Sequence, residues 1–501
     1  MKTILKFSGP IIFFLTWQWM EYNEHPNGMS ITAGLLAWMA LWWMTEAVNI
    51  YITALLPLFI LPLTGVMKMG EVTPSYMNDI IVLFIASFLF AYALEKWNLH
   101  NRVALKIILS VGNTPSRVLF GLMFSSYFVS MWINNTATVA MLLPAALAII
   151  GQLDKPGKPT KMAAPLLIGL AFSASIGGMA TLVGTFPNMI FFKEYHDRFP
   201  NEMPVTFADW MMFGVPISIA IFVICFFVLR FLHRGAMTSE SLDLTRCRND
   251  YKALGKLKYE EKWMIFFFFS MLLLWFFLYK MDLGSFTIPS WTSLFGIENG
   301  MSKDTKFITE ATVAIALVFL MFFIPTHNAK QSLPTEGSAK AGTLLDWHDV
   351  KRIPLGILFL FGGGFAISDA VDKTELDLLI SGMLQNFSDL SPFVLILCLC
   401  IFMTILSEFA SNTASLQLVF PILAPFVVSL GVHPLTVLIP VTLAASSGFM
   451  LPIATPPNTL VFGSERIKTK EMIRAGFFID LAGITIITMS AFTIIKWVMG
   501  I

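Results

Sequence analysis

Apolar stretches of about the length that crosses a lipid bilayer recur along the whole chain. A membrane-spanning helix needs about 20 predominantly apolar residues. Eleven such windows can be recognised, at 7–20, 30–46, 50–67, 79–95, 161–190, 209–230, 262–280, 310–325, 353–371, 433–462 and 474–499. With 56% hydrophobic and 13% charged residues among 501, a single soluble core could not cover this apolar surface. We therefore expect an all-α integral membrane protein that crosses the bilayer many times.

Two further regions differ from these windows. Residues 118–150 and 391–430 each contain two apolar arms, of about half to two-thirds of a spanning length, around a polar centre. Each region is expected to be a re-entrant hairpin, which enters and leaves the membrane on the same side. An ordinary polar loop is the alternative for either region taken alone, and it is weaker for two regions that are related by a repeat.

Positive charge is distributed unevenly among the loops. With the N-terminus inside, the inner segments contain 25 Lys and Arg residues and the outer segments contain 6. Cytoplasmic loops of membrane proteins carry such an excess. The order of membrane crossings that gives this charge distribution also predicts that hairpin 118–150 enters from the cytoplasm and that hairpin 391–430 enters from outside. It places the C-terminus outside. No small-residue cleavage site follows residues 7–20, so we expect this stretch to be an uncleaved first helix.

The two halves of the chain share a sequence pattern. Residues of the first half recur in the second half at a constant distance along the sequence. The matching residues are Leu83, Phe84, Phe88, Ala93, Lys96 and Leu99 in the first half and Leu360, Phe361, Phe365, Ala370, Lys373 and Leu376 in the second. The same separation relates residues 135–137 and 144 to residues 412–414 and 421. Beyond the hairpins the separation becomes slightly shorter, and there residues 178 and 184–188 match residues 448 and 454–458. Internal symmetry of this kind is typical of transporters.

Hairpins of opposite insertion, together with this symmetry, predict two inverted repeats over residues 30–235 and 262–501. An N-terminal helix region, 1–29, precedes them, and a basic cytoplasmic linker, 236–261, joins them. Gly, Pro and Asn residues interrupt the windows 161–190 and 433–462, where released backbone groups need a polar cavity or surrounding protein. Simple packing of Gly and Pro is the alternative. Each half is therefore expected to bring a hairpin tip and a broken helix to one site near mid-membrane.

The residues at the hairpin tips are polar but uncharged: Ser130, Asn134, Asn135 and Thr136 in the first half, and Ser407, Ser411, Asn412 and Thr413 in the second. Hydroxyls, amide NH2 groups and the free N–H groups of half-helix N-termini present positive dipole ends to an anion. The side-chain oxygens and unwound backbone carbonyls suit an alkali cation. The tips therefore predict a small anionic solute as cargo, with Na+ as the coupling ion.

These tips, together with residues 42–47 (WWMTEA), 53–58 (TALLPL) and 361–364 (FGGG), resemble the divalent anion/sodium symporter family over nearly the whole chain. The resemblance implies sodium-coupled symport of C4-dicarboxylates such as succinate, or of related di- and tricarboxylates, across a bacterial inner membrane. Some members move sulfate and some are sodium-independent dicarboxylate exchangers, and both alternatives remain open. The resemblance also implies a homodimer of elevator type, in which a transport domain moves against a static scaffold domain.

The resemblance also assigns roles to residues. One sodium site would be formed by Ser130, Asn134, Asn135 and the Gly184 carbonyl, and the other by Ser407, Asn412 and the carbonyls of Ala410 and Ala454. The substrate would contact Asn134, Asn135, Thr136, Ser411, Asn412 and Thr413, with Thr455 and Pro456 lining the pocket. Two residues depart from the family pattern, because Asn134 stands where serine is usual and Phe186 where a second proline is common.

Other function classes have less support. A net charge of +1 without a basic patch gives no support to a nucleic-acid partner. The four cysteines and seven histidines match no disulfide framework or metal motif, and no nucleophile or acid–base pair near the tips suggests a membrane enzyme. A channel is a further alternative. Glu408 is either functional or a structural hydrogen-bonding group, and Asp369 and Lys373 are expected to form an exposed helical ion pair.

Overall fold

The computed structural model describes residues 2–154, 160–237, 242–282, 287–297, 299–300, 307–327, 342–384 and 390–501. Within these ranges the fold is helical apart from one antiparallel ribbon of two-residue strands, β1 (Met281–Asp282) and β2 (Thr287–Ile288). Six residues used in the charge count lie outside the described ranges, namely Lys155, Lys158, Lys303, Lys306, Lys330 and Lys340, and so do positions 238–241 of the linker. Membrane orientation stays a prediction.

The first half is built from α1 (Lys2–Tyr22), α2 (Asn27–Thr45), α3 (Ile50–Thr53), α4 (Leu56–Leu63), α5 (Met69–Tyr76), α6 (Asp79–Lys96), α7 (Leu99–Val111), α8 (Pro115–Ser130), α9 (Asn135–Leu153), α10 (Ala163–Gly178), α11 (Phe186–Arg198) and α12 (Phe207–Leu232). The 3₁₀ segment η1 (Arg234–Ala236) and α13 (Thr245–Ala253) follow.

The second half is built from α14 (Tyr259–Phe276), η2 (Trp291–Phe295), α15 (Glu310–Met321), η3 (Asp349–Arg352), α16 (Leu355–Lys373), α17 (Leu376–Leu384), α18 (Pro392–Phe409), α19 (Asn412–Ser429), α20 (Pro434–Ala445), α21 (Pro456–Phe462), α22 (Thr469–Ala491) and α23 (Ile494–Met499).

Every apolar window recognised in the sequence contains at least one helix. In the part of the chain that the structure describes, seven helices are long and apolar enough to cross a membrane. The all-α polytopic prediction is therefore confirmed. The hairpin arms are longer than predicted, with 16 residues in α8, 19 in α9 and 18 in each of α18 and α19. Prolines do not end these helices, since Pro144 lies inside α9, and Pro421 and Pro425 lie inside α19.

Four helices, α5, α7, α13 and α17, were not expected from the apolar windows. Two of them show the internal repeat in the structure, since α7 and α17 begin at Leu99 and Leu376, which are a matched pair of the sequence pattern. Each follows a residue in the left-handed region, Asn98 with φ 58° and Glu375 with φ 57°. Non-glycine residues rarely adopt this conformation, so the two halves share an unusual turn at the same place.

The predicted ion pair between Asp369 and Lys373 is wrong. Lys373 Nζ lies 2.6 Å from Glu71 Oε2, and Asp369 Oδ2 accepts a 2.5 Å hydrogen bond from Ser75 Oγ. Both partners belong to α5, which was not expected as a helix. A spacing of four residues permits a pair on one helix, but here a neighbouring helix supplies the partners instead.

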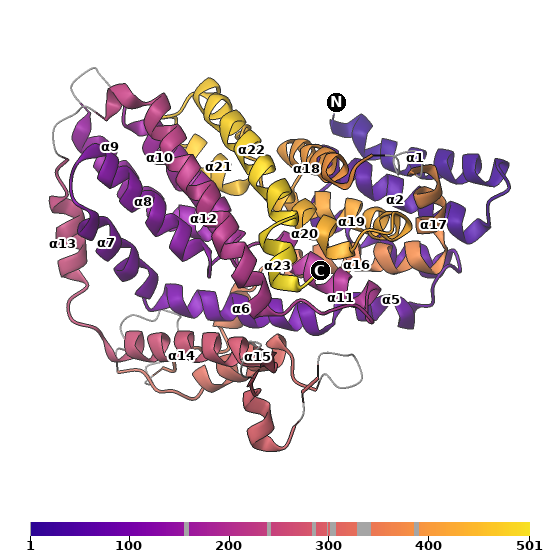
Figure 1. Ribbon diagram of the computed structural model, residues 1–501, viewed down its shortest axis with the longest axis horizontal. Helices are drawn as coiled ribbons and strands as arrows, with labels where there is room; N and C mark the ends of the chain where they lie inside the picture. The colour runs from indigo at the N-terminus through magenta and orange to yellow at the C-terminus, as the bar shows by residue number, and fades with distance from the viewer. Residues whose placement is uncertain are drawn as a thin grey trace.

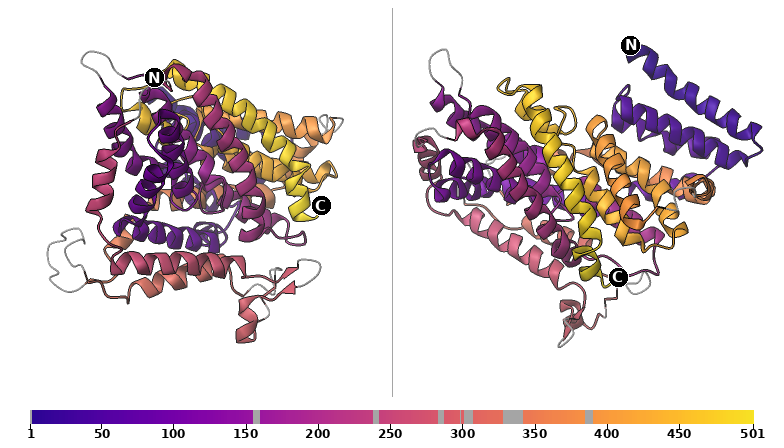
Figure 2. Two further views of the ribbon diagram at one scale, coloured as in Figure 1. Left: turned by 60° about the vertical axis from the view of Figure 1, so that its left-hand side comes forward. Right: turned by 45° about the horizontal axis from the view of Figure 1, so that its top comes forward.

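Each broken helix packs against the opposite half of the chain. The break between α10 and α11 covers residues 179–185, and the break between α20 and α21 covers residues 446–455. Beyond the break, α11 packs against α19 and α20, whereas α21 packs against α9 and α10. Figure 1 shows the two halves interlocked in this way, and in the right-hand view of Figure 2 the indigo helices α1 and α2 lie at one end of the molecule. The exchange of partners brings the two hairpin tips to one place.

A buried polar cluster fixes the far end of α11. Glu194 Oε2 accepts hydrogen bonds from Arg198 Nε at 3.0 Å and from Ser368 Oγ at 2.6 Å, and Arg198 Nη2 donates to Ser368 Oγ at 2.7 Å. Buried charges are tolerated when they are paired and hydrogen-bonded in this way. The cluster ties α11 of the first half to α16 of the second.

Candidate functional site

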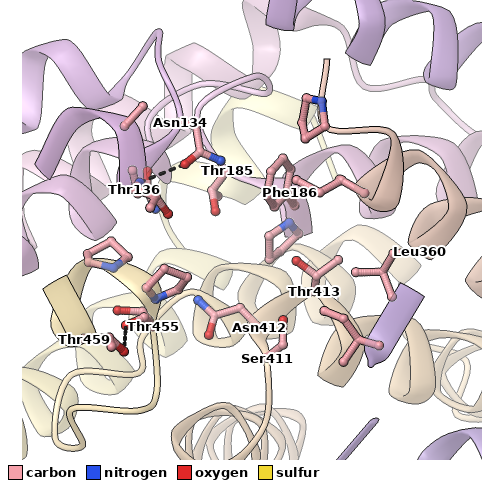
Figure 3. A pocket seen from close by; sticks show the side chains of 18 of the residues that line it. Asn134, Thr136, Thr185, Phe186, Leu360, Ser411, Asn412, Thr413, Thr455 and Thr459 are labelled. Atoms are coloured by element: carbon pink, nitrogen blue, oxygen red, sulfur yellow. Dashed lines mark hydrogen bonds between the residues drawn. The ribbon is translucent and has the colours of Figure 1, made fainter. Parts of the chain in front are cut away.

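The two hairpin tips and the two broken helices open on one cavity of about 1110 Å³. Figure 3 shows Asn134 and Thr136 on one side of this cavity and Ser411, Asn412 and Thr413 on the facing side. Eleven predicted site residues line it: Asn134, Asn135, Thr136, Gly184, Ala410, Ser411, Asn412, Thr413, Ala454, Thr455 and Pro456. The remaining two, Ser130 and Ser407, are fully buried behind the tip asparagines.

The first tip is held by a local cap. Asn134 precedes α9, and its side-chain oxygen accepts a 2.8 Å hydrogen bond from the backbone N–H of Thr136. Asparagine is among the best residues at this position because its short side chain reaches back to the free N–H groups of the first turn. The cap leaves Asn135, the first residue of α9, directed toward Ser130.

Oxygen atoms gather around the Asn135 amide. One end of this amide lies 2.7 Å from Ser130 Oγ and 3.2 Å from the carbonyl oxygens of both Ala174 and Gly184. When the amide nitrogen occupies that end, it donates to the two carbonyls. When the amide oxygen occupies it, four oxygens face one another, and a cation among them removes their mutual repulsion. An all-oxygen cage of this kind suits a hard cation such as Na+.

The second tip repeats the arrangement. Ser407 Oγ lies 2.7 Å from Asn412 Oδ1 and 2.5 Å from the carbonyl oxygen of Ala445. A hydroxyl has one proton and can donate it to only one of these oxygens. The second cage is therefore also rich in acceptors and poor in donors. The Ala174 and Ala445 carbonyls were missed in the sequence, because any residue type supplies a backbone carbonyl.

Close packing around the first cage depends on glycine. A Cβ atom at Gly178 would lie 2.5 Å from Asn135 Oδ1, and one at Gly184 would lie 2.6 Å from the Gly178 carbonyl oxygen. Distances below about 3 Å between such atoms are excluded by steric repulsion. These glycines let the end of α10 and the broken segment approach the amide of the hairpin tip.

The cavity combines helix N-termini, which attract anions, with few charged side chains. The helices α9, α11 and α19 begin at it, and helix N-termini carry partial positive charge and free N–H groups. Its described lining contains one basic residue, Arg352 of η3, and two acidic residues, Glu46 and Glu95. Sequence reasoning missed these three, since Arg352 counted only as a loop charge.

Glu408 proves to have a structural hydrogen-bonding role. Its two carboxylate oxygens accept hydrogen bonds from the backbone N–H groups of Met450 at 2.7 Å and Leu451 at 2.8 Å. These N–H groups belong to the break between α20 and α21, where no helical partner is available. Glu408 therefore attaches the second hairpin to the second broken helix, just behind the tip.

Comparisons with known proteins agree on the family. Residues 15–501 match the family described as the sodium:sulfate symporter transmembrane region. Similar relatives are the sodium-dependent dicarboxylate transporters SdcS of Staphylococcus saprophyticus and of Staphylococcus aureus, each 34% identical over 98% of this chain and 91% of its own length. The resemblance seen in the sequence is confirmed.

Solved structures give a more distant likeness. The YdaH transporter of Alcanivorax borkumensis is 13% identical with a TM-score of 0.55, over 84% of this chain and 86% of its own. MtrF of Neisseria gonorrhoeae, from a class of antimetabolite efflux pumps, is 14% identical with a TM-score of 0.59, over 87% of this chain and 84% of its own. At this identity the likeness shows a shared fold alone. The chain belongs to the sodium:sulfate symporter family, and it is an integral membrane transporter and not an enzyme.

Proposed function

We propose that this protein couples the uptake of a C4-dicarboxylate, or of a related di- or tricarboxylate, to sodium ions by alternating access. The observation that carries the proposal is the pair of equivalent Ser–Asn cages, each with a 2.7 Å contact, that lie behind two facing uncharged tips. The names of the SdcS relatives, sodium-dependent dicarboxylate transporters, support the same cargo and coupling ion.

The proposal assigns each side chain a part. Ser130, Asn134, Asn135 and the Gly184 carbonyl would bind one sodium ion, with the Ala174 carbonyl beside them. Ser407, Asn412 and the carbonyls of Ala410 and Ala454 would bind a second, with the Ala445 carbonyl beside them. The carboxylates of the substrate would meet the amides, hydroxyls and helix N-termini that face the cavity, including Thr136, Ser411, Thr413 and Thr455.

The arrangement in the membrane belongs to the same proposal. Residues 30–235 and 262–501 would form inverted repeats in a bacterial inner membrane, with the N-terminus in the cytoplasm and the C-terminus outside. Two copies would form a dimer, in which the tips and broken helices move against a static scaffold. Co-bound cations would neutralise the dianion at membrane depth, where an uncompensated charge is costly, and they would leave together with it.

Uptake of labelled succinate into proteoliposomes tests the proposal. We expect uptake to require an inward sodium gradient and to fail with an equal potassium gradient. Asn135→Ala and Asn412→Ala should each lower uptake by roughly a hundredfold, because each removes a cation ligand and a substrate donor. Asn101→Ala is the matched control, since the Asn101 amide bonds to Asn98 beside α7 and does not line the cavity. Uptake that ignores the sodium gradient would overturn the coupling.

Sulfate is a second candidate cargo, because the matching family is described by sodium:sulfate symport. Uncharged donors and helix N-termini bind a tetrahedral dianion as well as a carboxylate. A panel of succinate, citrate, 2-oxoglutarate and sulfate separates the candidates, first by sodium-dependent thermal stabilisation and then by uptake. Counterflow into vesicles preloaded with succinate, without sodium, would instead identify an exchanger.

A further inference from the structure

Two asparagines outside the proposed sodium sites occupy equivalent places in the two broken helices. Asn188 is the third residue of α11 and Asn458 is the third residue of α21, and the two positions match in the internal repeat. Both side chains are fully buried. Neither residue lines the cavity, so any role in transport must act through other groups.

Each amide nitrogen bridges two carbonyls of the preceding break. Asn188 Nδ2 donates to the carbonyl oxygens of Gly178 at 3.1 Å and Thr181 at 2.7 Å. Asn458 Nδ2 donates to those of Gly448 at 3.3 Å and Leu451 at 3.1 Å. An amide NH2 group has two hydrogens, and here both are used. The start of each non-helical segment is thereby connected to its middle.

The segment held in this way presents the proposed cation ligand. In the first half, Thr181 Oγ1 accepts a 3.1 Å hydrogen bond from the backbone N–H of Gly184. In the second half, the Leu451 carbonyl accepts a 3.2 Å bond from the backbone N–H of Ala454. Thr181 therefore connects Asn188 to Gly184 through hydrogen bonds. Leu451 connects Asn458 to Ala454 in the same way.

The other end of each amide is left without a partner. Asn188 Oδ1 and Asn458 Oδ1 are buried and make no hydrogen bond to any residue that the structure describes. A buried acceptor without a donor is unfavourable. Both halves nevertheless place the same side chain there, which indicates that the two donated bonds are what the position requires.

We infer that Asn188 and Asn458 are positioning residues that hold the Gly184 and Ala454 carbonyls toward the two cation cages, and so set sodium affinity. This inference rests on the proposed sodium coupling. It concerns residues that bind neither sodium nor substrate. Aspartate at either position has the same shape but replaces the NH2 group with an oxygen, which repels the two carbonyls that the amide now holds.

The test measures sodium dependence separately from maximal rate. For Asn188→Asp and Asn458→Asp we expect the sodium concentration at half-maximal succinate uptake to rise by roughly tenfold, as for a lost pair of buried bonds. Asn188→Thr and Asn458→Thr keep one donor and should give intermediate values. The rise in melting temperature that NaCl gives relative to KCl should be smallest for the aspartate variants and intermediate for the threonine variants.

Asn299→Asp is the matched control. The Asn299 amide also binds backbone groups through both ends, donating to the Ile308 carbonyl at 2.9 Å and accepting from two backbone N–H groups, but it lies outside the cavity lining. Its replacement should lower the melting temperature and leave the sodium midpoint unchanged. If an aspartate variant does not fold, the sodium midpoint of the threonine variant at the same position is the test. Folded variants with a wild-type sodium midpoint would overturn the inference, whereas a wild-type protein indifferent to sodium would instead overturn the proposed coupling.

Discussion

The two halves build the same cage and secure it by different chemistry. In the repeat, position 131 of the first half corresponds to position 408 of the second, and position 181 to position 451. In the first half the Thr181 hydroxyl donates to the Met131 carbonyl at 2.5 Å. In the second half the Glu408 carboxylate accepts from the backbone of Leu451. The repeat therefore keeps the place where hairpin and broken helix are joined, but it does not keep the groups that join them.

A second difference lies deeper in the same region. Ser218 and Asp480 hold the same place in two equivalent helices, since each is the twelfth residue, in α12 and in α22 respectively. Ser218 shares a 2.8 Å hydrogen bond with the Tyr127 hydroxyl. Asp480 is 4% exposed, so the second half buries a carboxyl group where the first half has a hydroxyl. The first half is joined by neutral groups and the second by the buried carboxylate of Glu408, so equivalent substitutions should have unequal effects.

The largest difference is expected between the equivalent glycines Gly178 and Gly448. An alanine Cβ at Gly178 would lie 2.5 Å from Asn135 Oδ1, whereas one at Gly448 would lie 3.1 Å from the Ser407 carbonyl oxygen. Gly178→Ala should therefore displace the amide of the first cage and reduce succinate uptake by roughly a hundredfold, as for severe overpacking. Gly448→Ala should reduce succinate uptake by roughly tenfold. Equal losses in uptake would show that the two cages are not packed differently.

The next comparison concerns the groups that join hairpin and broken helix. Glu408→Gln places an NH2 group against a backbone N–H and removes a charge-assisted acceptor, which should lower the free energy of unfolding by about 2 kcal/mol. Thr181→Val removes neutral hydrogen bonds and should lower it by about 1 kcal/mol. Melting temperatures in detergent measure the loss of stability in both variants, and sodium-dependent uptake is measured on the same variants. A larger effect for Thr181→Val would contradict the charged attachment.

Apolar windows and a repeat were enough to predict a helical membrane protein and its tips, because a segment inside the bilayer must be long and apolar whatever its tertiary contacts are. Helix lengths were less predictable, since α9, α18 and α19, expected as short hairpin arms, are long enough to cross a membrane. Helices α7 and α17 escaped this reasoning. In α7, buried Leu99, Leu105 and Ile108 alternate with polar residues, of which His100 and Arg102 are also buried, so no continuous apolar window marks the helix.

Residue polarity predicted the site only where side chains define it, and the carbonyls of Gly184, Ala410 and Ala454 came from the family resemblance. Ser130, Asn135, Ser407 and Asn412 could be recognised from their polarity between apolar arms. The Ala174 and Ala445 carbonyls could not, since backbone oxygens leave no trace in residue type. Arg352 could not either, because its approach to the cavity is a tertiary contact made by a segment far from both tips.

A smaller effect is expected at the tip position where the two halves differ in sequence. The Asn134 side chain caps α9, whereas Ser411 makes no capping hydrogen bond to α19. Serine is nearly as good a cap as asparagine, so Asn134→Ser should keep uptake within about twofold. Asn134→Ala should destabilise the protein by about 1 kcal/mol. Ser411→Ala should leave the melting temperature unchanged, although it removes a proposed substrate contact. A large loss of uptake in Asn134→Ser would show that the amide itself binds cargo or cation.

The smallest effect is expected at one exposed ion pair between the halves, Asp154 with Arg466, which lies outside the membrane-spanning segments. Asp154 Oδ2 lies 2.6 Å from Arg466 Nη2, and Asp154 Oδ1 accepts a 2.9 Å bond from the Thr160 N–H. The Arg466 hydrogen bond, and then that of Thr160, lower the pKa of Asp154 in the folded protein. The stabilisation is therefore fully present above the unfolded-state pKa, near the ordinary aspartate value, and it is lost as pH falls through the lower folded-state pKa.

Asp154→Asn keeps an acceptor for Thr160 and removes the charge, so it isolates this ion pair. We expect a slightly lower melting temperature than wild type at neutral pH, because exposed ion pairs contribute little. The difference should shrink in high salt, which screens exposed charges, and it should disappear below the folded-state pKa. A difference that persists at low pH and in high salt would mean that Asp154 acts by shape and not by charge.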